Sequence, residues 1–324
     1  MHVGREAELC HWTDLLGLLQ KLFRSIMPRP LRALKGTRIL SLALNLPGPA
    51  ALMRCRQMGA TCIKLEPPSG DPMGHYNKAA YAQLHEGVKV LTADLKIEAG
   101  QRLLHRELAK TDVLLTSFRP SALDKLGIGW KKLHRLYPAL SQVAIVGASG
   151  PRAEEPGHDL TYLADNGLVP GLELPATLYA DMSGSLMASE AVLQAARPQN
   201  ERYAGTGEAD PRGVFIEVAL AGAAAYLALP RQWGLTQSSG SVGGAHAGYR
   251  IYRCRDGRVA VAALEPHFAA ALCSAAGAPA SDMRAMFAPA THEAVAAFFL
   301  TQTRRELDQL AAQKDLPLHT MAAA

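Results

Sequence analysis

The sequence has few of the features that mark specialised classes of protein. Aromatic residues make up only 6% of its 324 residues, and its five cysteines include no Cys-x-x-Cys pair. An odd number of cysteines without paired spacing indicates neither a zinc site nor a disulfide framework, so a reducing, cytoplasmic compartment is expected. No apolar run approaches the roughly 20 residues that cross a bilayer. We therefore predict no metal centre and no membrane partner.

Two common phosphate-binding motifs are also missing. No Gly-x-Gly-x-x-Gly follows the first predicted strand, where Asn45-Leu-Pro-Gly-Pro stands instead, and no Walker loop occurs. A nicotinamide or flavin cofactor is therefore disfavoured. The formal net charge is +5, but Lys and Arg are scattered along the chain rather than gathered into a basic arm. A nucleic-acid partner is accordingly not expected.

What the sequence does contain is a series of short apolar runs separated by helical patterns. Buried strands are predicted at 37–43, 60–66, 112–117 and 142–146, with helices at 49–58 and 98–109. Strands that alternate with helices imply parallel βαβ units and a doubly wound sheet. The predicted fold class is α/β, with a large Rossmann-like domain and a smaller α+β domain.

Changes in composition along the chain predict four segments. Residues 1–33 form an N-terminal extension with a leucine-rich helix at 14–27, and residues 34–200 form the large domain. Residues 201–248 are linkers rich in Gly and Ser around a helix at 214–229. Residues 249–324 form the small domain, which opens with paired strands at 249–254 and 258–263 around a tight turn.

Several segments occur in an order that is typical of one protein family. They are Met58-Gly-Ala-Thr-Cys-Ile-Lys-Leu-Glu-Pro-Pro, Asp112-Val-Leu-Leu-Thr-Ser-Phe-Arg-Pro, Gly157-His-Asp-Leu-Thr-Tyr-Leu, Ala180-Asp-Met-Ser-Gly-Ser and Ala263-Leu-Glu-Pro-His-Phe. Together with shorter matches they span about residues 34–270. In this series the chain resembles the class III coenzyme A transferases (the CaiB/BaiF superfamily) and the related α-methylacyl-CoA racemases.

The resemblance implies an acyl-CoA thioester as substrate, with coenzyme A as part of that substrate and no separate cofactor. Gly-His-Asp followed by a later Asp is similar to the racemase branch, which inverts the α-carbon of 2-methyl-branched acyl-CoA. The resemblance makes His158 and Asp181 the two bases, Glu265 the carboxylate that holds the histidine, and Asp159 a polar neighbour. It also implies a homodimer, which is interlocked in the family.

Further residues are implied as contacts to coenzyme A. These are, around the adenosine and phosphates, Lys64, Ala93, Lys96, Arg119 and Lys125, with Tyr162 lining the pocket. Cationic side chains beside strand ends suit a phosphate-rich ligand. Lysines and arginines are commonly exposed without any ligand, so simple solvation remains an equal interpretation for each of them.

The chemistry can also be judged from the residue types alone. Removal of a proton α to a thioester generates an enolate, so inversion needs a base on each face of the carbon and a site for the oxyanion. A neutral histidine and a carboxylate whose pKa is raised by burial form a suitable pair.

Without the resemblance, the same residues have ordinary structural interpretations. Asp159 and Asp181 would be N-caps of helices predicted near 160–168 and 186–195. His158 would be a loop histidine and Glu265 a solvated glutamate. His267, two residues further on, is an alternative to Glu265.

Three departures from the family pattern leave other functions open. Met182-Ser-Gly-Ser stands in place of a run of glycines, and the interval between His158 and Asp181 is short. The sequence also stops before the segment that returns to the large domain in the family. Two alternatives therefore remain: a coenzyme A transferase in which Asp181 is the nucleophile, and a catalytically impaired protein that only binds coenzyme A.

Overall fold

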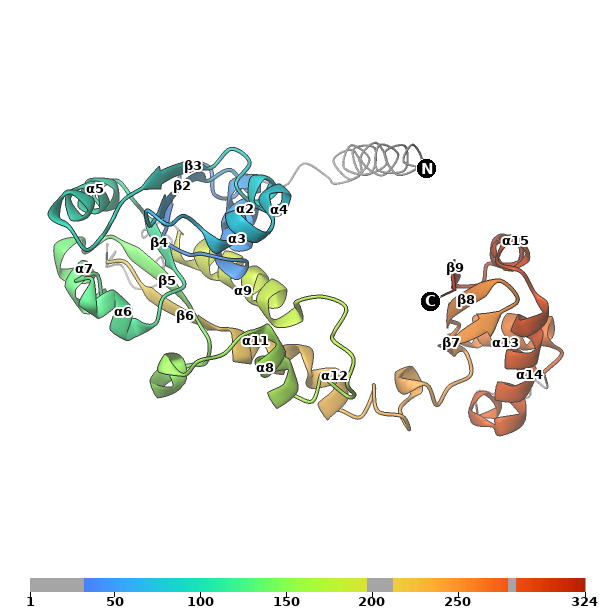
Figure 1. The fold of residues 1–324 in the computed structure, drawn as a ribbon. Coiled ribbons are helices and arrows are strands. Elements are labelled where there is room, and N and C mark those ends of the chain that lie inside the picture. The colour runs from blue at the N-terminus through green and yellow to red at the C-terminus, as the bar shows by residue number, and fades with distance from the viewer. Residues whose placement is uncertain (1–31, 197–211, 279–283, 324) are drawn as a thin grey trace, which may run out of the picture. The chain divides into compact units, whose positions relative to one another are not determined.

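The computed structural model describes residues 32–196, 212–278 and 284–323. The chain divides into two units, Met1–Tyr226 and Leu227–Ala324, each with its own core (Figure 1). The helix predicted at 14–27 and most of the first predicted linker lie outside the described residues.

The first unit is built on a six-stranded sheet in the order β3-β2-β1-β4-β5-β6. Its strands are β1 (Arg38–Ser41), β2 (Thr61–Glu66), β3 (Lys89–Thr92), β4 (Val113–Thr116), β5 (Ser141–Val146) and β6 (Phe215–Ala219). All neighbouring pairs are parallel. Every residue of β4 and β5 is buried, as expected for parallel strands covered on both faces. The predicted α/β fold class is confirmed.

Helices cover both faces of this sheet because neighbouring strand residues point to opposite sides. Ile39 belongs to the core under α2 (Pro47–Gln57) and α9 (Tyr179–Ala195). Leu40 belongs to the core under α5 (Glu98–Leu108), α6 (Pro120–Lys125) and α7 (Trp130–Leu136). The shorter elements are α3 (Pro72–Tyr76), α4 (Lys78–Leu84), the 3-10 helix η1 (Gly150–Glu154), α8 (Asp159–Asp165) and α11 (Leu220–Leu227).

One predicted helix is wrong in its first part. The segment 214–229 was expected to be helical, but residues 215–219 form β6 and pair with β5 from Gln142↔Phe215 to Val146↔Ala219. The helix α11 starts only at Leu220. A short apolar run fits either structure, and here the backbone groups of β5 provide the hydrogen-bonding partners that decide it. The exposed strand β3 was not predicted at all.

The second unit contains an antiparallel sheet in the order β7-β8-β9, with β7 (Tyr249–Cys254), β8 (Gly257–Ala262) and β9 (Leu318–Met321). The predicted hairpin of the first two strands is confirmed. Its helices are α12 (Leu229–Gln232), α13 (Pro266–Ala276), α14 (Pro289–Thr301) and α15 (Arg304–Lys314). Among the described helices of both units, none combines the length and the apolar character that crossing a bilayer requires.

Candidate active site

Three of the residues predicted to carry the chemistry, His158, Asp159 and Asp181, lie near the carboxyl end of β5, where α8 and α9 begin. His158 is the N-cap residue of α8 and its side chain is exposed. The backbone N–H of His158 donates to Thr161 Oγ1 at 3.1 Å, and this hydroxyl donates to the His158 carbonyl at 2.8 Å. These two bonds fix the start of α8 and involve only backbone atoms of His158. Ligands of doubly wound sheets bind outside the carboxyl ends of the strands.

Asp159 connects the two helices. Its side chain is buried, and Oδ1 accepts a hydrogen bond from the backbone N–H of Asp181 at 2.9 Å. The expectation that Asp159 and Asp181 are N-caps of their own helices is wrong, because the N-cap residues are His158 and Leu178. The N-cap residue of α9 has an apolar side chain, which cannot bond to the free backbone N–H groups of the first turn. The carboxylate of Asp159 accepts a hydrogen bond from one of these N–H groups instead.

Asp181 lies in the first turn of α9 and is partly buried. The pKa of its carboxyl is raised from 3.8 to about 6, mainly by burial and also by the charge of Asp159, while His158 acts to lower it. A helix N-terminus favours a carboxylate, so desolvation outweighs the helix dipole at this position. The structure thus brings together three predicted residues and gives one of them a pKa near neutrality, which suits proton transfer.

Tyr162 of α8 is buried close to Gly147 and Gly157. A Cβ atom on Gly147 would lie 2.3 Å from the Tyr162 hydroxyl oxygen, and a Cβ on Gly157 would lie 2.5 Å from it. Both positions therefore require glycine. Burial raises the pKa of the Tyr162 hydroxyl, Asp181 raises it further, and Arg119 lowers it. The hydroxyl is consequently protonated at neutral pH and lies within electrostatic range of both charged side chains.

Arg119 and Lys125 lie at the two ends of the short helix α6, and both are exposed. Glu154 of η1 accepts hydrogen bonds from the backbone N–H and the hydroxyl of Ser121, both at 2.7 Å. These bonds lower the pKa of Glu154, with a further contribution from Arg119 and Lys125. The two cations therefore lie around the same carboxylate, and their contact with coenzyme A remains a prediction.

The predicted ligand contacts Ala93 and Lys96 follow β3. Ala93 is buried, and its backbone N–H donates to the Glu66 carbonyl at 2.9 Å. Lys96 is exposed, and its backbone N–H donates to Asp94 Oδ1 at 2.9 Å. Their contacts with coenzyme A remain predictions.

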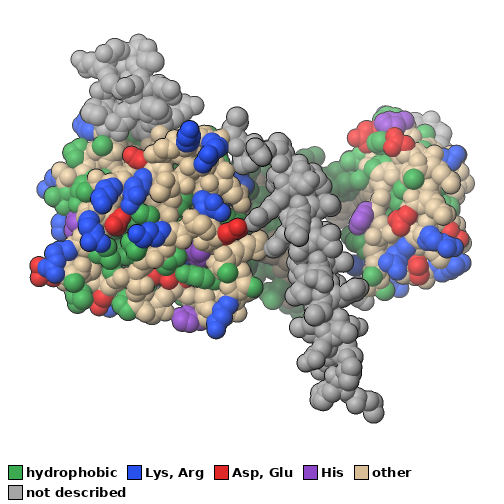
Figure 2. Space-filling model, turned by 90° about the horizontal axis from the view of Figure 1, so that it is seen from above, with side chains coloured by type: hydrophobic (Ala, Val, Ile, Leu, Met, Phe, Trp, Pro, Cys, Tyr) green, Lys and Arg blue, Asp and Glu red, His purple; other side chains and the backbone are tan. Residues whose placement is uncertain are grey.

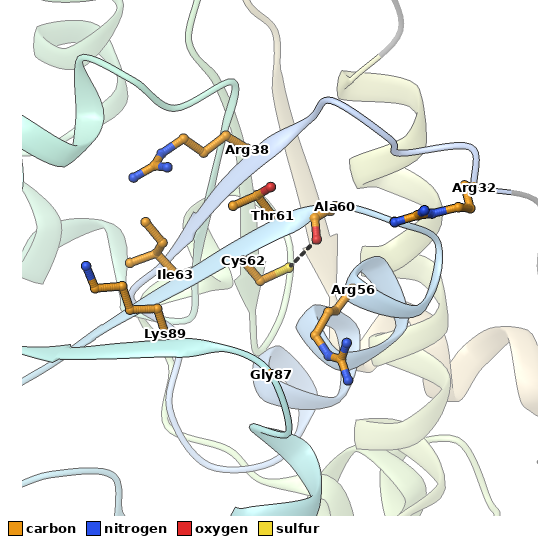
Figure 3. Close-up of a pocket in the computed structure, with 10 residues that line it drawn as sticks. Arg32, Arg38, Arg56, Ala60, Thr61, Cys62, Ile63, Gly87 and Lys89 are labelled. Atoms are coloured by element: carbon orange, nitrogen blue, oxygen red, sulfur yellow. Dashed lines mark hydrogen bonds between the residues drawn. The ribbon is translucent and has the colours of Figure 1, made fainter.

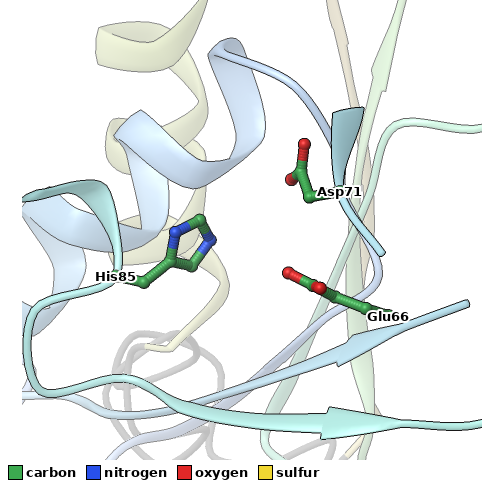
Figure 4. A group of neighbouring side chains, drawn as sticks. All are labelled: Glu66, Asp71 and His85. Carbon is green, nitrogen blue, oxygen red and sulfur yellow. The ribbon is translucent and has the colours of Figure 1, made fainter. Parts of the chain in front are cut away.

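Lys64, in contrast, lies in the interior. Its side chain has no exposed surface, and its ammonium contacts Asp71, Glu66 Oε1 at 3.1 Å and His85 Nε2 at 2.8 Å. Figure 4 shows the side chains of Glu66, Asp71 and His85, whose possible ligand atoms lie within 4.8 Å of one another. They would suit a metal ion, but the Lys64 ammonium already supplies the positive charge among them. This burial does not favour the predicted contact between Lys64 and a phosphate.

Sequence reasoning missed Asp71 and Tyr76, which shape the loop after β1. Asp71 Oδ1 accepts hydrogen bonds from the backbone N–H groups of Asn45 at 3.1 Å and Met73 at 2.9 Å. Tyr76 donates to Asn45 Oδ1 at 3.4 Å, and burial together with the charges of Asp71 and Asp181 raises its pKa. Tyr76 is therefore a neighbour of the candidate base. The Asp-Pro pair at 71–72, typical of a helix start, was the available indication.

Glu265 belongs to the second unit, where it is the exposed N-cap residue of α13. The alternative candidate His267 is also exposed, and its ring lies 3.9 Å from that of Phe268, centroid to centroid. The role of Glu265 toward His158 remains a prediction.

The described residues thus form a doubly wound sheet, with His158, Asp159 and Asp181 at its carboxyl edge, and a separate small unit. The chain belongs to CoA-transferase family III, whose model matches residues 34–324. The resemblance seen in the sequence is therefore confirmed.

Individual relatives include both transferases and racemases. The chain is 31% identical over 202 residues to the succinyl-CoA–D-citramalate CoA-transferase of Chloroflexus aurantiacus, which covers 58% of this chain and 50% of that protein. It is 27% identical to the α-methylacyl-CoA racemase of Homo sapiens over 269 residues. This alignment covers 78% of this chain and 66% of the racemase.

The fold is shared with solved structures. The crystal structure of a hypothetical protein from Mycobacterium tuberculosis matches with a TM-score of 0.75 at 24% identity, over 90% of this chain and 85% of that chain. The alignments with the first three curated relatives cover between 36% and 50% of their length.

Proposed function

We propose that the chain is an acyl-CoA racemase that inverts the α-carbon of a 2-methyl-branched acyl-CoA without a separate cofactor. The observation that carries the proposal is the half-buried Asp181, whose carboxyl has a pKa of about 6 and lies within electrostatic range of His158. A group with this pKa is present in both protonation states near neutral pH, as a residue that alternates between acid and base requires.

In the proposed reaction, neutral His158 removes the α-proton, and the electron pair of the C–H bond moves into an enolate. Protonated Asp181 then returns a proton to the opposite face, which inverts the centre. In the reverse direction the carboxylate takes the proton and the imidazolium returns one. The first turn of α9, at the positive end of a 17-residue helix, stabilises negative charge that develops beside it.

The exposed cations Arg119 and Lys125 support the assignment of coenzyme A to the same edge of the sheet. Arg119 is the N-cap residue and Lys125 the last residue of α6, which follows the neighbouring strand β4. Their guanidinium and ammonium groups match the phosphates of the coenzyme.

Isotope exchange tests the proposal. A single enantiomer of a 2-methylacyl-CoA, incubated with the protein in deuterium oxide, should gain one deuterium at the α-carbon and lose optical purity. Asp181→Asn and His158→Ala should each slow the exchange by about 10²- to 10⁴-fold, since each removes one base. Asp165→Asn, an exposed carboxylate on α8, is the matched control and should retain activity. Absence of exchange in the unmodified protein refutes the proposal.

A second candidate is a coenzyme A transferase, which the transferase names among the relatives favour. Asp181 would attack the thioester carbonyl and expel the coenzyme A thiolate, leaving a mixed anhydride. Hydroxylamine should then trap an acyl group at Asp181, and His158→Ala should remain active. Calorimetry that detects acyl-CoA binding with neither exchange nor trapping would instead identify a binding protein without catalysis.

A further inference from the structure

A basic cavity lies at the opposite edge of the main sheet, at the amino ends of β1, β2 and β3. It has a volume of about 400 Å³, and four of its ten lining residues are the cations Arg32, Arg38, Arg56 and Lys89, with no acidic residue among the ten (Figure 3). The six residues of β2 run from this edge to the carboxyl edge, which separates the two regions by roughly 15 to 20 Å. The cavity therefore does not belong to the proposed active site.

Most of the positive charge at this cavity is not neutralised. Arg38 Nη2 donates to Glu107 Oε2 at 2.7 Å, so its charge is offset. Within the part of the chain that the structure describes, the other three cations form no ion pair. The face seen in Figure 2 likewise shows Lys and Arg side chains more prominently than Asp and Glu side chains on the first unit. A ligand here would have to be an anion.

The backbone at this edge is shaped to hold two arginine side chains. Gly59 and Gly87 have positive φ angles of 100° and 70°. A Cβ at Gly87 would lie 2.8 Å from Arg56 Cζ, and a Cβ at Gly59 would lie 3.2 Å from Arg32 Cβ. Because the glycines lack side chains, both arginines pack directly against the chain. A guanidinium packed in this way loses less conformational freedom on binding than one extended into solvent.

We infer that this cavity binds a small phosphate-bearing anion. Planar guanidinium groups match the oxygens of a phosphate in bidentate geometry, and an ammonium from Lys89 adds a third charge. Figure 3 shows Arg38 and Lys89 toward one end of the cavity and Arg32 and Arg56 toward the other, so that each end carries two cations. The volume is at the lower end of the range for small-ligand sites, roughly 300 to 1,000 Å³. The ligand is either a free diphosphate or the phosphate part of a nucleotide.

Calorimetry on the full chain tests this inference with inorganic pyrophosphate and with adenosine 3′,5′-bisphosphate. The double variant Arg56→Gln/Lys89→Gln should raise the Kd for pyrophosphate at least tenfold, because two charge-assisted hydrogen bonds are lost. The control Lys131→Gln/Arg135→Gln removes two exposed cations from α7 and should leave the Kd within about twofold.

A second variant separates the two edges of the sheet. Arg119→Gln/Lys125→Gln changes the cations of the proposed coenzyme A region and should not alter the Kd for pyrophosphate. If pyrophosphate binding is lost in that variant alone, or if the cavity variant binds as the unmodified protein does, the inference is overturned. If the bisphosphate binds more tightly than pyrophosphate and the cavity variant abolishes this binding, the ligand is a nucleotide. If the two compounds bind with equal affinity, the ligand is a free diphosphate.

Discussion

Replacement of Asp181 by asparagine should make the protein more stable at neutral pH while it slows the proposed reaction. Burial and, to a smaller extent, the charge of Asp159 raise the pKa of this carboxyl from 3.8 to about 6, so the folded state holds the proton more tightly than the unfolded chain does. The unmodified protein therefore loses stability as pH rises from about 4 through about 6, and the loss is complete above that range. Asparagine carries no charge at any pH and avoids this cost.

The magnitude follows from the size of the shift. A shift of about 2 pKa units at roughly 1.4 kcal/mol each corresponds to about 3 kcal/mol, and partial exposure to solvent reduces this to about 2 kcal/mol. The hydrogen bond to Asp159 is retained, because its donor is the backbone N–H of residue 181. The gain from Asp181→Asn should thus be near zero at pH 4 and about 2 kcal/mol at pH 8.

Urea unfolding of both proteins at several pH values between 4 and 8 measures this difference. The exposed Asp165→Asn on the neighbouring helix is the control, and its effect should stay within about 0.5 kcal/mol at each pH. If the gain in unfolding free energy from Asp181→Asn does not grow with pH, or if the variant is less stable at pH 8, then the pKa of the Asp181 carboxyl is not raised in the folded state.

Urea unfolding also tests the packing around Tyr162 and around Lys64. Gly147→Ala should destabilise by about 1 to 3 kcal/mol, and Tyr162→Phe should restore most of this loss, because the predicted clash is with the hydroxyl oxygen. Gly157→Ala should not be rescued by Tyr162→Phe, since its Cβ would also lie 2.6 Å from the ring carbon Cε1. Lys64→Met should cost about 3 to 5 kcal/mol by leaving buried carboxylates unpaired, and Lys64→Met/Asp71→Asn should recover part of that.

The main sheet could be predicted from the sequence where its strands are apolar and bounded by turns. The strands predicted at 37–43, 60–66, 112–117 and 142–146 are confirmed as β1, β2, β4 and β5. The failures are the two edge strands, β3 and β6. Edge strands are covered less completely, so their residues follow no clear pattern of burial, and only pairing with a neighbour determines their structure.

The site could be predicted only as a set of residue types. The roles of His158 and Asp181 follow from a family resemblance, because their residue types alone also allow an ordinary loop histidine and a helix N-cap. The bond from Asp159 to the neighbouring helix joins residues 22 positions apart, so no local pattern reports it. For Lys64 the sequence predicts a contact to coenzyme A or simple solvation, whereas three partners up to 21 positions away hold its side chain in the interior.

The late position of β6 in the chain has a consequence for biosynthesis. When the first 196 residues have left the ribosome, both helices that carry the proposed bases exist, but β5 still presents a row of unpaired amides and carbonyls. Residues 215–219 must be synthesised before β6 can pair with the free side of β5, and before α9 can pack against both strands. Until then the nascent chain exposes a strand that is buried throughout in the finished protein, which is the situation in which intermolecular strand pairing and chaperone dependence arise.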